Sequence, residues 1–251
     1  MIVLKSAVKE QKLARQVLCS LLSAGVMSIC ISGGDARASD TVTLTQDTTY
    51  NDIGEIPQHI IMNGKNITSY DMLGNGSDDR SITGAGTETL TIANVENKLN
   101  VGVGAFFDKN SRIVLSKIKI IDIQGDWSRD IKSALYTNNQ GSITMNDIGS
   151  FKISGGNDNG VGIHAMSGTI SINAETVSVK DVANAVFGQL NEDGKQESSR
   201  IEITTTGDME FLAKATAVAA VNLSQSFSNN SALVSLSGQN VTIATALYRS
   251  G

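Results

Sequence analysis

Two stretches of sequence decide the fold: GSITMNDIGSFKIS at residues 141–154 and GTISINAETVSVKD at residues 168–181. They align with each other, and SRIEITTTGDMEFLA and ALVSLSGQNVTIAT repeat the pattern farther along the chain. The four copies are led by aliphatic residues at intervals of 27, 31 and 33 residues, namely Ile143, Ile170, Ile201 and Val234. Repeats of this length indicate a solenoid, in which each unit buries its apolar face against the next.

Short alternating runs predict that the chain is almost all β from Thr41 onward. No stretch of helical length shows a period of 3.6 residues, whereas period-2 alternation is frequent. Examples are the pairs Leu90 and Ile92, Ile113 and Leu115, and Ile118 and Ile120. Aromatic residues make up only 4% of the chain and there is one proline, which suits a narrow interior and a backbone whose N–H groups nearly all pair.

A third strand of small residues ending in an aliphatic one completes each repeating unit. These strands are expected at residues 133–135, 161–163, 184–186 and 219–221. The fold class predicted is therefore all-β: a right-handed parallel β-helix, a solenoid of three-strand rungs, following an N-terminal helical signal peptide. In this fold Ile143, Ile170 and Ile201 form one inward column. The alternative is a β-sandwich, which also alternates at short spacing but has no reason to repeat one three-strand unit.

The first 38 residues have the pattern of a secretory signal peptide. Four basic residues precede the uncharged run VLCSLLSAGVMSICI at residues 17–31, and the triplet Ala36-Arg37-Ala38 follows it. The apolar run is 15 residues long, whereas a membrane-spanning helix needs about 20. We therefore expect Ala36 and Ala38 to be recognised by signal peptidase, with residues 1–38 as the signal peptide and 39–251 as a β-helix domain. An uncleaved anchor is the alternative.

Cysteine usage and charge exclude several function classes. Cys19 and Cys30 both precede the predicted cleavage site, so the mature chain has no disulfide and no catalytic thiol. Removing the leader takes away five basic and two acidic residues, which changes the formal charge from -5 to -8. An acidic exported chain is not expected to bind nucleic acid.

Two long polar loops are the candidate partner-binding segments. Residues 189–199 and 224–231 occupy the same place in their units, where the two earlier units have short turns. Loops at equivalent positions of a solenoid project from one edge, and such edges often bind partners. The candidate residues are Asn191, Glu192, Asp193, Lys195, Phe227, Asn229 and Asn230. The alternative is that long turns are simply tolerated there.

The sequence offers little support for catalysis. Its two histidines, His59 and His164, lie beside no nucleophile turn of a hydrolase. His164 alternates with the inward Ile163 and is expected to point outward, while His59 is expected to begin a strand. With no mature cysteine and no histidine pair at ligand spacing, neither a metal site nor a cofactor is predicted.

The long basic leader, the Ala-x-Ala triplet, the cysteine-free mature chain and degenerate rungs such as IIMNGKNIT at residues 60–68 together resemble a bacterial autotransporter. The chain is similar to the amino-terminal passenger region of that family, and it ends at Gly251 without a barrel. The resemblance implies export to the Gram-negative cell surface or medium, and a non-catalytic role in adhesion, biofilm or host interaction. The implied partners are the export machinery, an outer-membrane barrel absent from this chain, and a glycan or protein on a host or neighbouring cell.

An exported β-helix polysaccharide lyase or polysaccharide-binding protein is the second hypothesis. A lyase of this kind uses acidic residues to hold calcium and a basic residue to abstract a proton. The one cluster that could serve is Asp122, Asp126, Arg129 and Asp130. These residues resemble a turn beside Trp127 more than an active site, so we expect no enzyme.

Overall fold

The computed structural model describes the β-helix domain in ten segments. They are residues 41–51, 55–70, 74–75, 79–93, 106–109, 112–125, 133–156, 160–190, 198–221 and 231–245. All of them belong to the second of two units, Ser39–Gly251. The predicted signal peptide, with Ala36 and Ala38, lies outside the described residues.

Sixteen strands and no α-helix occur in these segments. The strands are β1 (Thr41–Thr43), β2 (Thr48–Tyr50), β3 (His59–Ile61), β4 (Ile67–Ser69), β5 (Gly74–Asn75), β6 (Arg80–Thr83), β7 (Thr89–Ala93), β8 (Phe106–Lys109), β9 (Arg112–Ser116), β10 (Ile120–Gly125), β11 (Ser133–Gly155), β12 (Val161–Gln189), β13 (Ser199–Thr205), β14 (Asp208–Val221), β15 (Ala232–Ser237) and β16 (Asn240–Thr245). His59 begins a strand, as its sequence context predicts.

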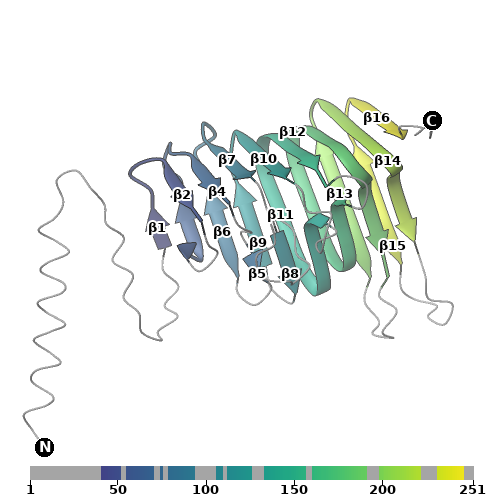
Figure 1. Ribbon diagram of the computed structural model, residues 1–251, viewed down its shortest axis with the longest axis horizontal. Coiled ribbons are helices and arrows are strands. Elements are labelled where there is room, and N and C mark those ends of the chain that lie inside the picture. Colours follow the sequence, from purple (N-terminus) through teal and green to yellow (C-terminus); the bar gives the residue numbers. More distant parts are fainter. Residues whose placement is uncertain are drawn as a thin grey trace, which may run out of the picture. The chain divides into compact units, whose positions relative to one another are not determined.

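Every pairing between these strands is parallel, which confirms the parallel β-helix and excludes the sandwich. The first ladder contains β1, β3, β6, β9, β13 and β15, with residues 141–146 of β11 and 168–174 of β12. The second ladder contains β2, β4, β7, β10, the start of β14 and β16, with residues 150–155 and 176–180. Figure 1 shows β2, β4, β7 and β10 side by side.

A third ladder closes each rung. It contains β5, β8, residues 133–138 of β11, residues 161–166 and 184–189 of β12, and residues 216–221 of β14. The Gly160 carbonyl joins the two halves of this ladder, because it accepts hydrogen bonds from the Ala183 and Asn184 N–H groups at 2.8 and 3.2 Å. The long strands β11 and β12 therefore each run through all three ladders.

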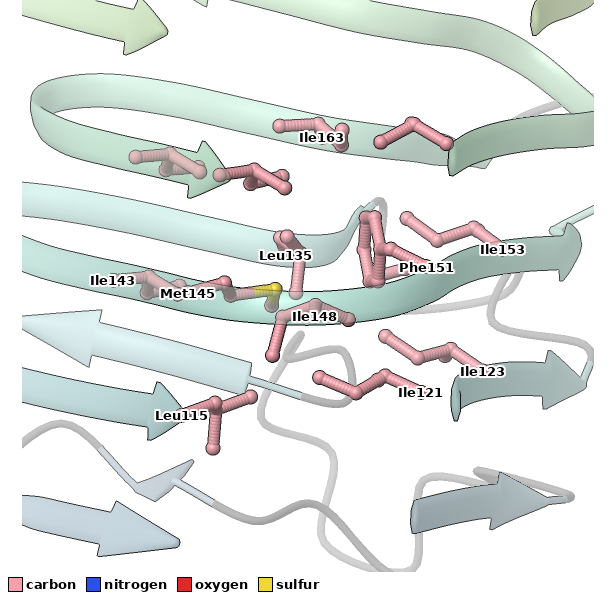
Figure 2. Packing of buried hydrophobic residues seen from close by; sticks show 14 of the residues in the cluster. Leu115, Ile121, Ile123, Leu135, Ile143, Met145, Ile148, Phe151, Ile153 and Ile163 are labelled. Atoms are coloured by element: carbon pink, nitrogen blue, oxygen red, sulfur yellow. The ribbon is translucent and has the colours of Figure 1, made fainter. Parts of the chain in front are cut away.

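The predicted inward column is present. Ile143 pairs with Ile170, Ile170 with Ile201, and Ile201 with Val234, and the three isoleucines are fully buried. Ile113 continues the column on the other side. Figure 2 shows side chains of these columns inside the coil, with Met145 of the first ladder, Leu135 of the third and Phe151 of the second pointing into the same interior. Like side chains stack on like because parallel strands repeat every 4.8 Å or so.

The corners between ladders are made by residues in the left-handed conformation. They are Lys117 and Asp147 between the first and second ladders, Gly155 and Asp181 between the second and third, and Gln140 and Ser167 between the third and first. One such residue turns the chain without interrupting the strand for long. Gly155 is required at its corner, because a Cβ there would collide with the Gly125 carbonyl of the preceding rung.

The corners also correct three details of the sequence interpretation. The alignment of residues 141–154 with 168–181 holds only as far as Met145 opposite Ile172, after which the register shifts by one residue and Phe151 pairs with Val177. The pair Ile118 and Ile120 does not lie on one face, because the inward residues after the corner are Ile121 and Ile123. The last third-ladder segment has residues 216–218, not 219–221, opposite residues 184–186.

We expect an inward charge to be far more destabilising than an outward one. Ile170→Asp buries a carboxylate between Ile143 and Ile201 and should cost several kcal/mol of unfolding free energy. Asn173→Asp, three residues along the same strand but exposed, should cost less than about 0.5 kcal/mol. Urea unfolding followed by circular dichroism compares the two variants. Equal losses would contradict the assignment of inward and outward positions.

The strands β15 and β16 should open before the long strand β11. Val241 and Ile243 continue the inward column of Met209 and Phe211, yet they are 42% and 51% exposed. Strand edges and apolar faces left uncovered in this way exchange their amide hydrogens quickly. Hydrogen exchange should therefore be faster in β15 and β16 than in β11, and equal protection would overturn the prediction.

Candidate functional site

The two predicted loops begin and end at stacked positions on one edge of the solenoid. The loop residues Asn191, Glu192, Asp193, Lys195, Phe227, Asn229 and Asn230 lie outside the described residues. Their anchors are described: Gln189 pairs with Val221 where the loops begin, and Ser199 pairs with Ala232 where they end. The Leu190 N–H also donates to the Val221 carbonyl at 3.3 Å. The described ends of both loops therefore lie at the corner between the third and first ladders.

The same corner in the two preceding rungs is made by single left-handed residues. Gln140 and Ser167 turn the chain there, and β11 and β12 continue through the corner as strands. The backbone pairing therefore does not require a long loop at this position. The extra residues of the later rungs are additions to a corner that a single residue can make.

Three aromatic side chains stack on the outer side of the third ladder, next to this edge. We call Tyr136, His164 and Phe187 the aromatic stripe. The ring centroids of Tyr136 and His164 are 5.2 Å apart at an interplanar angle of 67°, and those of His164 and Phe187 are 5.5 Å apart at 71°. Both are edge-to-face contacts, the arrangement that ring quadrupoles favour. One ring comes from each of three successive rungs, since Tyr136 pairs with His164 and Phe187 lies in the segment that follows.

His164 occupies an outward position but is nevertheless buried. Its neighbours Ile163 and Ala165 belong to the core, so alternation turns the imidazole outward, as the sequence predicts. The sequence does not predict that the side chain is only 8% exposed. The rings of Tyr136 and Phe187 cover it from both sides, and the Ser133 hydroxyl lies 3.1 Å from its Nδ1 atom.

Burial keeps the His164 imidazole uncharged at neutral pH. Desolvation lowers the pKa of His164 to about 4, and the side chain of Gln189 opposes that shift only in part. The Nε2 atom is buried and makes no hydrogen bond of normal geometry with the described part of the chain. The stripe therefore contains a neutral ring whose Nε2 atom is enclosed and lies within reach of the Gln189 side chain.

Polar and thioether side chains flank the stripe at the next outward position along each strand, on the side of the loop edge. Asn138, Met166 and Gln189 are half-buried residues that follow the three aromatic rings by two positions. The Tyr136 hydroxyl contacts the Met166 sulfur at 3.6 Å, and the Ser167 hydroxyl donates to the Asn138 side chain at 3.4 Å. None of these side chains is charged at neutral pH. The candidate site is thus an uncharged face, with aromatic rings and amides, beside two long loops.

The contact between Ser133 and His164 is better explained as a structural hydrogen bond than as a catalytic pair. Both side chains are buried, so a substrate would have to displace the rings above them. No group of three or more His, Cys, Asp or Glu side chains that could hold a metal occurs among the described residues. Of the possible lyase cluster, the structure describes only Asp122, which contacts the Gln124 amide. Asp126, Arg129 and Asp130 lie outside the described residues.

Comparisons with other proteins do not assign the chain. No family model, no curated protein and no solved structure matches it. None of the described segments forms a helix long and apolar enough to span a membrane.

The buried histidine predicts a loss of stability in mild acid. Between the unfolded pKa near 6.5 and the folded value of about 4, the unfolded chain binds a proton at His164 that the folded chain does not. The contribution of neutral His164 to the free energy of unfolding is therefore full above pH 6.5. It falls toward pH 4 by up to about 1.4 kcal/mol per pH unit, and by about 3 kcal/mol in all. His164→Phe keeps an aromatic ring and should remove this part of the pH dependence. Urea unfolding of both proteins at pH 7.5, 6.0 and 5.0 tests it, and parallel pH profiles would contradict it.

Proposed function

We propose that this chain is an exported, non-catalytic β-helix passenger that binds a glycan or protein on host or neighbouring cells. The observation that carries the proposal is the stacking of two long-loop anchors at one corner, beside the aromatic stripe. The solenoid backbone does not require the long loops, because the preceding rungs turn at Gln140 and Ser167 without a loop. Surplus loops and outward rings grouped on one side of a rigid scaffold are typical of a binding surface.

Other features of the chain support export. Residues 39–251 contain no cysteine, so no disulfide has to form or break during passage through a membrane pore. The fold is built rung by rung from neighbours, which allows it to form progressively as the chain emerges. The partners required are the export machinery and an outer-membrane barrel. The proposed location is the Gram-negative cell surface or medium.

Surface display is tested with the full chain in its native cells. Mass spectrometry of the exported protein should find Ser39 as the first residue. Protease added to intact cells should cut the protein, while a periplasmic control protein stays intact. A product that retains Cys30, or a protein protected until the cells are lysed, would count against export to the surface.

Adhesion is tested by shortening one loop. Replacing residues 191–197 with the tripeptide Ser-Gly-Ser should leave the fold intact, because the strands on both sides keep their partners. We expect attachment of cells that display this variant to fall by about tenfold, as for removal of a central group of contacts. The matched control is Asn173→Asp on the first ladder, which should attach normally. Unchanged attachment in the loop variant, with normal display, would contradict the assignment of this loop to binding.

A further inference from the structure

We infer that the aromatic stripe binds an uncharged, extended β-linked glycan whose chain runs along the solenoid axis. This inference rests on the proposed binding function and identifies the ligand class for it. It rests on three observations: the spacing of the rings, the absence of charge on the stripe, and the amide groups beside it.

The spacing of the rings suits a polymer of sugar rings. Tyr136, His164 and Phe187 come from successive rungs, and parallel rungs repeat at about 4.8 Å. One pyranose unit of an extended β-linked chain has nearly the same length. The two outer rings make similar angles with His164, 67° and 71°, and both belong to half-buried residues. Tyr136 and Phe187 therefore each leave part of an aromatic side chain in solvent, two rungs apart, a spacing that suits alternate sugars of the chain.

The polar groups of the stripe match sugar hydroxyls. The side-chain amides of Asn138 and Gln189 each contain a donor and an acceptor, as a hydroxyl does. His164 lies between Tyr136 and Phe187, and its buried Nε2 atom is oriented by the Gln189 side chain instead of by a ligand. Sites for small ligands and sugars combine aromatic walls with a few polar groups of this kind. Gln189 is also an anchor of the first long loop, which connects the stripe to that loop.

The charge distribution favours a neutral glycan over an acidic one. The six residues of the stripe and its flank are Tyr136, Asn138, His164, Met166, Phe187 and Gln189, and none is cationic at neutral pH because the pKa of His164 is lowered. The whole chain has a formal charge of -5. Lys109 pairs with Asn138 in the preceding rung, so one cationic residue borders the stripe, but the negative net charge of the chain still opposes the approach of a polyanion.

Defined oligosaccharides test the inference directly. The purified full chain is titrated with cellohexaose and chitohexaose as neutral β-linked probes, maltohexaose as an α-linked probe and oligogalacturonate as an anionic probe. Isothermal titration calorimetry gives the affinity, and NMR shows whether the ring signals of Tyr136 and His164 shift. We expect at least one neutral β-linked probe to bind and to shift these signals, and we expect the anionic probe not to bind.

Matched variants separate binding from folding. Phe187→Leu keeps an apolar side chain but removes the flat ring, and we expect it to weaken binding by about tenfold while changing stability little. Tyr136→Ala should weaken binding similarly, and Tyr136→Phe should restore most of it. The control is Thr144→Ala on the outer side of the first ladder, which should bind within about twofold of the unaltered protein.

The outcomes distinguish this inference from the proposed function. Failure of all neutral β-linked probes to bind, or full binding by Phe187→Leu, overturns the glycan inference. If cells still attach in that case, and protease treatment of the target cells abolishes attachment, the ligand is a protein and the passenger function stands. If the chain is not displayed at the surface, the passenger function fails, and the titrations in vitro still decide whether the stripe binds glycans.

Discussion

Backbone hydrogen bonding between one rung and the next is the constraint on which the rest of the structure depends. A shift of one residue would turn an inward column to solvent, so the register has to be kept from rung to rung. The pairing of β11 with β12 keeps it over three ladders and absorbs two irregularities, both at corners. The inward columns, the loop anchors and the aromatic stripe all take their positions from this register.

The parts of the fold that were predictable from sequence are those where burial selects the residue type. The column through Ile143, Ile170 and Ile201 was predicted because a polar residue there would be buried without a partner. The corners were not predictable, since a single left-handed residue can add or remove one position while alternation continues on both sides. That explains the shifted pairing of Phe151 and the misplaced third-ladder segment at residues 219–221. The candidate loops were recognisable by length, whereas the stripe was not, because its residues are 23 to 28 positions apart and align only through the corners.

In the amino-terminal rungs two buried charged side chains are stabilised by hydrogen bonds to the backbone instead of by apolar packing. Glu88 is 1% exposed and accepts N–H bonds from Gly64, Ala85 and Thr87 at 2.7 to 2.9 Å. Desolvation raises the pKa of the Glu88 carboxyl, but these backbone donors outweigh it and the net pKa is lowered. Arg80 stands where later rungs have isoleucine and donates to the Ile56 carbonyl at 2.9 Å. Both side chains thus replace missing strand-to-strand hydrogen bonds by bonding to backbone groups at turns.

The fixed register between rungs also divides the strand positions into inward ones that stabilise the fold and outward ones that can bind a ligand. Inward positions are selected by packing, so variation that serves a ligand is confined to outward positions and corners. On the third ladder the outward rings of Tyr136 and Phe187 remain half-buried, while His164 between them is almost enclosed. Packing alone accounts for the central ring, but it does not account for two outer rings that leave part of their apolar surface in water. The aromatic row ends on one side where Ala219 pairs with Phe187, whereas in the other direction Phe107 of β8 takes the position opposite Tyr136.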